Sequence, residues 1–291
     1  MRVLVIRQDH LGDVLLMTPL IRALARGGAA VTLACRRSVQ PAIEGNPHVH
    51  ECEALEDIGG DFERSPWTLA RWIQSRKFDA CLLLLPDPPS LIWAVVLGGV
   101  RRRLTAGGGI AARLCGFQQV RTGLPDIPRH YAEAHLDFAA AIGFAADGAG
   151  LDWFVADAEK DWARGFLSAR GRLERPVVGI HPGCGGNTCN LRGAEYGRVA
   201  GFLLQGAAGT VIITGGAGDV GLIDEWDSTL LNDRRMVNTV GKLSLRQLGA
   251  LIGEMDLLVA PSTGPLHIAS ALGVQTLSPF CGRIYLRPAV W

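Results

Sequence analysis

The sequence predicts an α/β fold made of two doubly wound parallel-sheet domains. Short β-branched runs alternate with amphipathic segments from end to end, which is the pattern of repeated βαβ units. The chain has 291 residues, of which 48% are hydrophobic, enough for two cores. We therefore expect one domain over residues 1–150 and a second over 151–291, joined by the Gly/Ala-rich stretch "IGFAADGAGLDWF" at 142–154.

Apolar runs mark the expected strands in each half. They are "VLVI", "AVTLAC", "ACLLLL" and "RRRLTA" before the boundary, and "PVVGIH", "TVIIT", "RMVNTV", "DLLVAP" and "VQTLSP" after it. The segment "DAEKDWARGFLSAR" at 157–170 predicts a helix that opens the second domain. Because loops at the carboxyl ends of parallel strands form the ligand crevice of such sheets, functional residues are expected directly after each run.

The overall composition excludes several classes of protein. The net charge is +1, so neither half is a nucleic-acid-binding domain by bulk charge. The seven cysteines are scattered without a CxxC pair, which favours reduced core residues of a cytoplasmic protein and no metal site. No secretory signal is visible, and "CLLLLPDPPSLIWAVVLGGV" is interrupted by prolines, so no transmembrane helix is expected.

A basic cluster stands at Arg101, Arg102 and Arg103. It fits an ordinary solvated face, and it also fits an anionic partner. We predict that these three arginines bind an anionic acceptor.

The first loop of interest is "RQDHLGD", which follows "VLVI". Gly12 permits a tight turn, and Asp13 then falls at the start of the next helix, where helix dipoles favour a carboxylate. Asp13 is either a helix cap or a general base held ionised. Pro19 either kinks one helix or, with Thr18 as cap, begins a second.

The second loop is "GIHPGCGGNTCNLRGAEY", residues 179–196. Gly183, Gly185 and Gly186 precede an amphipathic helix and would let backbone N–H groups approach a diphosphate, with Arg192 as the nearest cation. The alternative is that these glycines only make a sharp turn. His181, at the strand end, is either structural or a ligand contact.

The third loop, "TVIITGGAGDVGLIDE", formally matches GxGxxG at Gly216, Gly218 and Gly221. A dinucleotide site would also need an acidic residue about 20 positions later, where this chain reads "NTVGK". A nucleotide-dependent oxidoreductase is therefore a minor alternative. Asp219 either binds a ribose hydroxyl or caps a helix.

The loop "VGKLSLRQL" holds Ser244 and Gln247 at the spacing of a capping box. The residues before them, Gly241, Lys242 and Leu243, are candidates to line a nucleotide-base pocket.

The last loop is in "DLLVAPSTGPLHIASALG". Ser262, Thr263 and Gly264 precede Pro265 at a helix start, so free N–H groups and hydroxyls would form an anion site. His267 lies in the first helical turn, as a surface residue or as a donor to a diphosphate.

Taken together, "RQDHLGDVLLMTPLIRAL", "HPGCGGN" and "PSTGPLHIASALGV" resemble glycosyltransferase family 9, the heptosyltransferases of lipopolysaccharide assembly, over nearly the whole chain. The resemblance implies a GT-B fold, two Rossmann-like domains with a cleft between them. It also implies inverting transfer of heptose from ADP-heptose to a lipopolysaccharide core, without a cofactor or required metal ion. The donor would bind the second domain, and a glycolipid acceptor at the inner membrane face would bind the first.

By position, Asp13 matches the family's catalytic base. Thr263, Gly264 and His267 match its donor-phosphate loop, and Gly241–Leu243 match the segment that packs on the nucleotide.

The sequence also departs from the family pattern. Cys189 and Asn190 stand where members commonly carry a basic residue, and Ser262 stands where they often carry Asp. The chain ends at "LRPAVW", short of the usual final helices, as if truncated. These departures keep open a weakly catalytic or non-catalytic nucleotide-sugar-binding relative.

Overall fold

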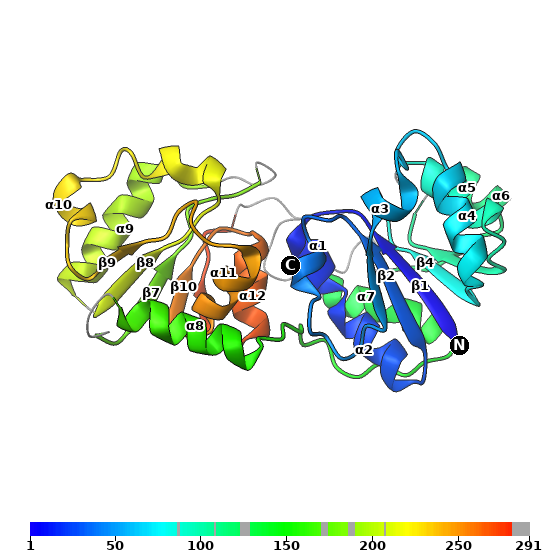
Figure 1. Ribbon diagram of the computed structural model, residues 1–291, viewed down its shortest axis with the longest axis horizontal. Helices are drawn as coiled ribbons and strands as arrows, with labels where there is room; N and C mark the ends of the chain where they lie inside the picture. Colours follow the sequence, from blue (N-terminus) through cyan, green and yellow to red (C-terminus); the bar gives the residue numbers. More distant parts are fainter. Residues whose placement is uncertain are drawn as a thin grey trace. The chain divides into compact units, whose positions relative to one another are not determined.

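The computed structural model describes residues 1–85, 88–107, 109–122, 129–169, 174–185, 190–206 and 208–280. The chain divides into two compact units, Met1–Asp152 and Trp153–Trp291, and the division falls inside the expected Gly/Ala-rich join. Each unit is a parallel sheet covered by helices (Figure 1). No helix in the described ranges has the length and apolar character needed to cross a bilayer.

The first unit is built on a six-stranded parallel sheet of order β3-β2-β1-β4-β5-β6. Its strands are β1 Arg2–Arg7, β2 Ala30–Cys35, β3 Glu51–Ala54, β4 Ala80–Leu83, β5 Arg102–Thr105 and β6 Gln118–Gln119. Its helices are α1 Leu11–Leu16, α2 Thr18–Arg26, the 3₁₀ turn η1 Gln40–Ala42, α3 Leu55–Gly59, α4 Trp67–Arg76, α5 Ser90–Leu97, α6 Gly109–Leu114 and α7 Tyr131–Ala141.

Strand β1 shows why the run "VLVI" is continuously apolar. Val3 and Val5 enter the core on the face covered by α1, α2 and α7, whereas Leu4 and Ile6 enter the core under α4, α5 and α6 (Figure 1). All four residues are fully buried because this central strand is covered on both faces.

The second unit is built on a five-stranded parallel sheet of order β11-β10-β7-β8-β9. Read from β9 to β11, this is the same order as that of the first five strands of the first sheet. Its strands are β7 Val177–Ile180, β8 Thr210–Ile213, β9 Met236–Asn238, β10 Leu257–Val259 and β11 Gln275–Leu277. Its helices are α8 Asp157–Ser168, α9 Gly193–Gln205, the 3₁₀ helix η2 Ala217–Leu222, α10 Ser228–Leu231, α11 Leu245–Ile252 and α12 Gly264–Ala271.

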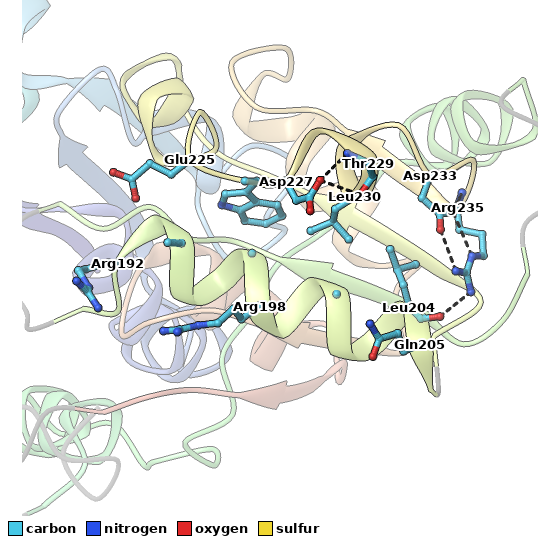
Figure 2. A pocket seen from close by; sticks show the side chains of 14 residues that line it. Arg192, Arg198, Leu204, Gln205, Glu225, Asp227, Thr229, Leu230, Asp233 and Arg235 are labelled. Atoms are coloured by element: carbon cyan, nitrogen blue, oxygen red, sulfur yellow. Dashed lines mark hydrogen bonds and ion pairs between the residues drawn. The ribbon is translucent and has the colours of Figure 1, made fainter.

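An elongated cavity of about 630 Å³ runs along α9 in the second unit (Figure 2). Its walls are α9 on one side and the segment 225–235 on the other. Trp226 also lines the cavity, and its indole ring packs on Gly197.

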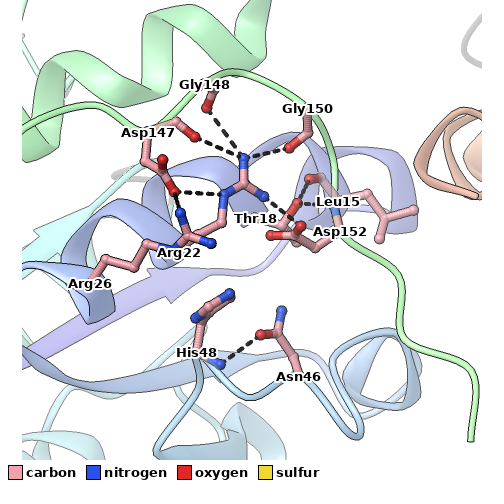
Figure 3. Close-up of polar contacts among 10 residues, drawn as sticks. All are labelled: Leu15, Thr18, Arg22, Arg26, Asn46, His48, Asp147, Gly148, Gly150 and Asp152. Atoms are coloured by element: carbon pink, nitrogen blue, oxygen red, sulfur yellow. Dashed lines mark hydrogen bonds and ion pairs between the residues drawn. The ribbon is translucent and has the colours of Figure 1, made fainter.

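Hydrogen bonds and ring contacts fix the residues on each side of the boundary between the units. Thr18 Oγ1 accepts a hydrogen bond of 2.9 Å from the Asp152 backbone N–H, and the Arg22 guanidinium binds the Asp152 carboxylate and three backbone carbonyls (Figure 3). On the next residues, Arg246 lies 5.2 Å over the Trp153 ring and donates a 2.7 Å hydrogen bond to the Phe154 carbonyl.

Candidate functional site

Both sheets reverse their strand order at one point, between β1 and β4 in the first unit and between β7 and β10 in the second. Ligands of open parallel sheets bind at such reversals, outside the carboxyl ends of the strands. The loops that follow β1, β7 and β10 begin at these two places. They are three of the loops in which the sequence predicts functional residues.

At the end of β1, one guanidinium joins two carboxylates. Arg7 Nη2 lies 2.6 Å from Asp9 Oδ2 and 2.9 Å from Asp13 Oδ1. The side chains of Arg7, Asp9 and Asp13 are 11%, 15% and 18% exposed, so the cluster is mostly desolvated but still open to solvent. A carboxylate that is held in place and still reached by solvent has the position that general-base chemistry requires.

Asp9 differs from Asp13 in its environment. Burial raises the pKa of Asp9 above its ordinary value, the nearby Asp13 charge acts in the same direction, and Arg7 opposes both. Sequence reasoning singled out Asp13 alone, although Arg7 and Asp9 stand in the same loop and complete the cluster.

A buried histidine lies beneath this cluster. His135 on α7 is 6% exposed, and its Nδ1 lies 3.0 Å from the Leu16 carbonyl oxygen at the end of α1. Burial lowers the pKa of His135 to about 4, with a further lowering by Arg7, so the ring is neutral at neutral pH. His135 is a second residue that the sequence did not reveal, because α7 follows β1 by more than 120 residues.

The structure decides two questions about the start of α1 and α2. Asp13 is the third residue of α1, the N-cap is His10, and the Asp13 carboxylate binds Arg7 rather than capping the helix. Pro19 lies in the first turn of a second helix, α2, as one alternative predicted. Thr18 is not the cap of that helix, because its hydroxyl donates to the Leu15 carbonyl oxygen at 2.7 Å.

In the second unit, the loops after β7 and β8 meet. The Cα of Gly183 faces Asp219 so closely that a Cβ there would overlap the carboxylate. Asp219 Oδ2 accepts a 2.7 Å hydrogen bond from the Gly216 backbone N–H at the start of η2. Asp219 therefore caps the start of η2. Its carboxylate also lies next to Gly183 in the predicted diphosphate loop.

His181 is a structural residue of this region. It is 6% exposed, its Nδ1 lies 2.9 Å from Thr214 Oγ1, and burial lowers its pKa to about 4. A neutral ring that is hydrogen-bonded within the core does not point to a ligand contact.

Asn190, which departs from the family pattern, makes two hydrogen bonds beside the described part of the glycine loop. Asn190 Nδ2 donates to the Pro182 carbonyl oxygen at 2.7 Å, and Asn190 Oδ1 accepts from the buried Tyr196 hydroxyl at 2.8 Å. Gly185 is exposed, and Gly186 lies outside the described residues. The Arg192 side chain is 80% exposed beside Glu195, so its cation is open to solvent.

The loop after β10 lies next to the loop after β7, because these strands pair and the His181 backbone N–H donates to the Val259 carbonyl oxygen at 2.9 Å. Thr263 is the extended N-cap of α12, and its side chain makes no capping hydrogen bond. Ser262, Thr263 and Gly264 are partly exposed, whereas His267 is buried. Backbone N–H groups in the first turn of α12 are the donors that an anion would use.

The turn Gly241–Leu243 adjoins the loop after β8. Gly241 adopts φ +71°, a left-handed conformation that favours glycine, and its N–H donates to the Gly215 carbonyl oxygen at 2.9 Å. Lys242 Nζ donates to the Asn238 carbonyl oxygen at 3.0 Å. The capping box is present, since Ser244 and Gln247 exchange hydrogen bonds of 2.9 and 3.2 Å.

The GxGxxG match does not have the geometry of a dinucleotide site. Residues 217–222 form the six-residue 3₁₀ helix η2 rather than a long α-helix. A Cβ at Gly218 or Gly221 would meet nothing within 4 Å, so neither glycine is required by close packing. Both observations weigh against the oxidoreductase alternative.

The basic cluster lies at the amino end of β5, whereas Asp13 follows the carboxyl end of β1. Arg102 begins β5, and the carboxyl end of that strand is the edge that faces ligands. Arg102 donates to the carbonyl oxygens of Ala141 and Ile142, and Arg103 lies 5.8 Å over the Phe117 ring. Arg101 is exposed. These contacts explain Arg102 and Arg103 without an acceptor, and acceptor binding by the cluster stays a prediction that its position does not favour.

Among the predicted donor-binding residues that the structure describes, Arg192 alone lines the cavity along α9 (Figure 2). The cavity is therefore separate from the glycine loop and the turn at Ser262–Gly264.

Comparison with known proteins gives a consistent result. The model of glycosyltransferase family 9 (heptosyltransferase) matches residues 67–281, well over half of the chain. A family 9 glycosyltransferase structure from Veillonella parvula superposes with a TM-score of 0.77 at 18% identity, covering 95% of this chain and 80% of that one. The E. coli ADP-heptose lipopolysaccharide heptosyltransferase II gives 0.75 at 20% identity, covering 96% and 84%.

The similarity to curated sequences is more local. The lipopolysaccharide core heptosyltransferase OpsX of Haemophilus influenzae is 40% identical over 52 residues, which are 18% of this chain and 15% of that protein. A second H. influenzae protein, whose name proposes a glycosyltransferase, is 30% identical over 112 residues, 38% of this chain and 32% of its own length. The matched part thus spans a third or less of these curated relatives. The fold is that of the GT-B heptosyltransferases, and the chain belongs to glycosyltransferase family 9.

Proposed function

We propose that this protein is an inverting, metal-independent glycosyltransferase that moves a heptose or similar sugar from ADP-heptose to a lipopolysaccharide core or related glycan. The observation that carries the proposal is Asp13, a partly exposed carboxylate at the strand-order reversal of the first sheet, paired with Arg7 at 2.9 Å. Family membership supports the transferase class. The similarity to the E. coli ADP-heptose lipopolysaccharide heptosyltransferase II and to the E. coli heptosyltransferase WaaC with ADP supports the donor.

In the proposed reaction, Asp13 accepts the proton of an acceptor hydroxyl as that oxygen attacks the anomeric carbon of the donor. The new C–O bond forms on the face opposite the bond to the diphosphate, so the configuration inverts. The electron pair of the broken bond leaves with the nucleoside diphosphate.

The second unit supplies the groups that would stabilise the departing diphosphate. They are the backbone N–H groups at the start of α12, the glycine loop at 183–185 and the exposed Arg192 guanidinium. Asp219 and the Gly241–Leu243 turn stand beside these loops and are proposed to contact the nucleoside.

A donor panel tests the proposal. ADP-, GDP-, UDP- and dTDP-sugars are scored for nucleotide release with a lipopolysaccharide core acceptor, in the presence and absence of EDTA. We expect release from ADP-heptose alone, unchanged by EDTA, and a product of inverted anomeric configuration by NMR. ADP-heptose binding without turnover would instead indicate the non-catalytic relative, and a thermal shift with NADH but not with ADP would indicate the oxidoreductase.

A further inference from the structure

Arg7 meets its two carboxylates through one nitrogen. Its Nη2 makes both contacts, at 2.6 Å to Asp9 Oδ2 and at 2.9 Å to Asp13 Oδ1. Its Nε is buried and has no hydrogen-bond partner among the described residues. Because an Nη2 group carries two hydrogens, each carboxylate can receive one of them. Asp13 is thus held through a single oxygen.

Two other arginines, each with a single carboxylate partner at its Nε and Nη2, show a different arrangement. Arg235 Nε and Nη2 lie 3.1 and 2.9 Å from the two oxygens of Asp233 (Figure 2). Arg246 Nε and Nη2 lie 2.8 and 2.5 Å from the two oxygens of Glu159. The planar fork of a guanidinium favours this two-point pair. In such a pair, both oxygens of the carboxylate are occupied.

A two-point pair at Asp13 would leave the proposed base without a free oxygen. Among the described residues, Arg7 is the one group that bonds to the Asp13 carboxylate, and it reaches only Oδ1. The Asp13 side chain is 18% exposed. The second oxygen, Oδ2, is therefore the one that can accept a proton from a bound hydroxyl group.

We propose that Asp9 is a positioning residue of the transfer reaction, which keeps Arg7 from closing on both oxygens of Asp13. Asp9 takes one Nη2 hydrogen, and Asp13 Oδ1 takes the other. The proton of the attacking hydroxyl moves to Asp13 Oδ2, while the contact with Arg7 at Oδ1 persists and holds the side chain in place. The role in turnover rests on the proposed function, whereas the arrangement of the three side chains does not.

Replacing Asp9 with Ala tests this role. We expect Arg7 to turn Nε and Nη2 onto the two oxygens of Asp13. The kcat should then fall about 10–100-fold, because freeing one oxygen from a charge-assisted hydrogen bond costs a factor of this size. The KM for the donor should stay nearly unchanged. Asp9→Glu keeps a carboxylate beside Arg7 and should retain most of the turnover.

A second substitution separates this effect from a general loss of structure. Lysine carries a point charge and cannot form the two-point pair, so Arg7→Lys/Asp9→Ala should turn over faster than Asp9→Ala alone. The matched control is Asp57→Ala, at an aspartate whose ion pair with Arg37 is exposed, and its kcat should equal that of the unaltered chain. A double variant slower than Asp9→Ala would overturn the inference.

A crystal structure of the Asp9→Ala variant gives a readout that needs no turnover. Arg7 Nε and Nη2 should each lie within about 3.2 Å of a different oxygen of Asp13. An Nε that still has no carboxylate partner, or an unchanged kcat in Asp9→Ala, would overturn the inference and leave the proposed function standing. The two-point pair in a protein whose unaltered form transfers no sugar would support the constraint by Asp9 and overturn the proposed function.

Discussion

Arg7 Nη2 lies 2.9 Å from Asp13 Oδ1, and the same nitrogen lies 2.6 Å from Asp9 Oδ2. One cation thus serves two carboxylates at the end of a buried strand. The Arg7 guanidinium therefore fixes the position of the Asp13 carboxylate.

Replacing Asp13 with Asn should reduce turnover by ~10²–10⁴ while leaving the affinity for ADP-heptose nearly unchanged, because only the proton acceptor is removed. Steady-state kinetics and donor titration calorimetry measure the two effects. Asp61→Asn, at a side chain 62% exposed, serves as the control. Wild-type turnover in the Asp13 variant would remove the base from the mechanism.

Replacing Arg7 with Met should raise the pKa of Asp9 further, because Arg7 is the main group that lowers it against burial. Carboxyl NMR titration detects the change. The variant should also lose turnover, since Asp13 loses its ion-pair partner. A titration of Asp9 that does not move would show that Arg7 does not act on these carboxylates in solution.

Replacing Gly183 with Ala should destabilise the second unit by about 1–3 kcal/mol, because the new methyl group overlaps the Asp219 carboxylate that is bonded to Gly216. Chemical denaturation measures the loss. Gly218→Ala, at an open position on η2, is the matched control. Adding Asp219→Ala to the Gly183 variant should recover most of the loss, and strictly additive effects would contradict the contact.

Acidification should destabilise both units through their buried histidines. His135 and His181 have pKa values near 4 in the folded protein, against 6.5 for an ordinary histidine. Between these values the unfolded chain binds more protons, so the free energy of unfolding falls as the pH drops from 6.5 to 4, by up to about 3 kcal/mol for each ring. Denaturation across this range should show a shallower pH slope in His135→Gln and in His181→Gln than in the unaltered chain, and an unchanged slope in both variants would contradict the prediction.

Replacing Arg22 with Ala should destabilise the first unit by about 3 kcal/mol. The Arg22 side chain is only 11% exposed. Its removal leaves the Asp152 carboxylate and the carbonyl oxygens of Gly148 and Gly150 without this donor (Figure 3). Arg26→Ala is the comparison, since the Arg26 side chain is 60% exposed and its ion pair with Asp147 should contribute less than about 1 kcal/mol. Equal losses in the two variants would show that the Arg22 contacts do not stabilise the unit.

Every apolar run quoted from the sequence coincides with an observed strand, and two polar strands were missed. The central strands β1, β4, β7 and β8 are apolar along their length because both of their faces are covered, whereas β11 was found although its three residues are exposed. The missed strands, β3 "ECEA" and β6 "QQ", are the two edges of the first sheet, where exposed side chains need not be apolar.

The candidate site residues could be proposed from the sequence where one loop holds them and not where distant segments meet. Asp13 and Thr263 follow strands directly and could be found from the sequence. His135 beneath α1, and the carbonyl oxygens of Ala141 and Ile142 that bind Arg102, lie on segments that pair only in the folded chain. Hydrophobic periodicity and motif spacing describe neighbouring residues and cannot predict contacts between distant segments.

The anchoring of residues 152 to 154 has a practical consequence for dissecting the protein. Asp152 is hydrogen-bonded to α2 of the first unit, and Trp153 is buried in the second unit. The boundary between the two units therefore falls at the single peptide bond between these residues. Because the backbone is held on both sides of that bond, we expect it to resist proteolysis. A gene divided between these two codons would instead give each half its complete set of internal contacts, which makes separate expression of the halves a realistic route to their isolated chemistry.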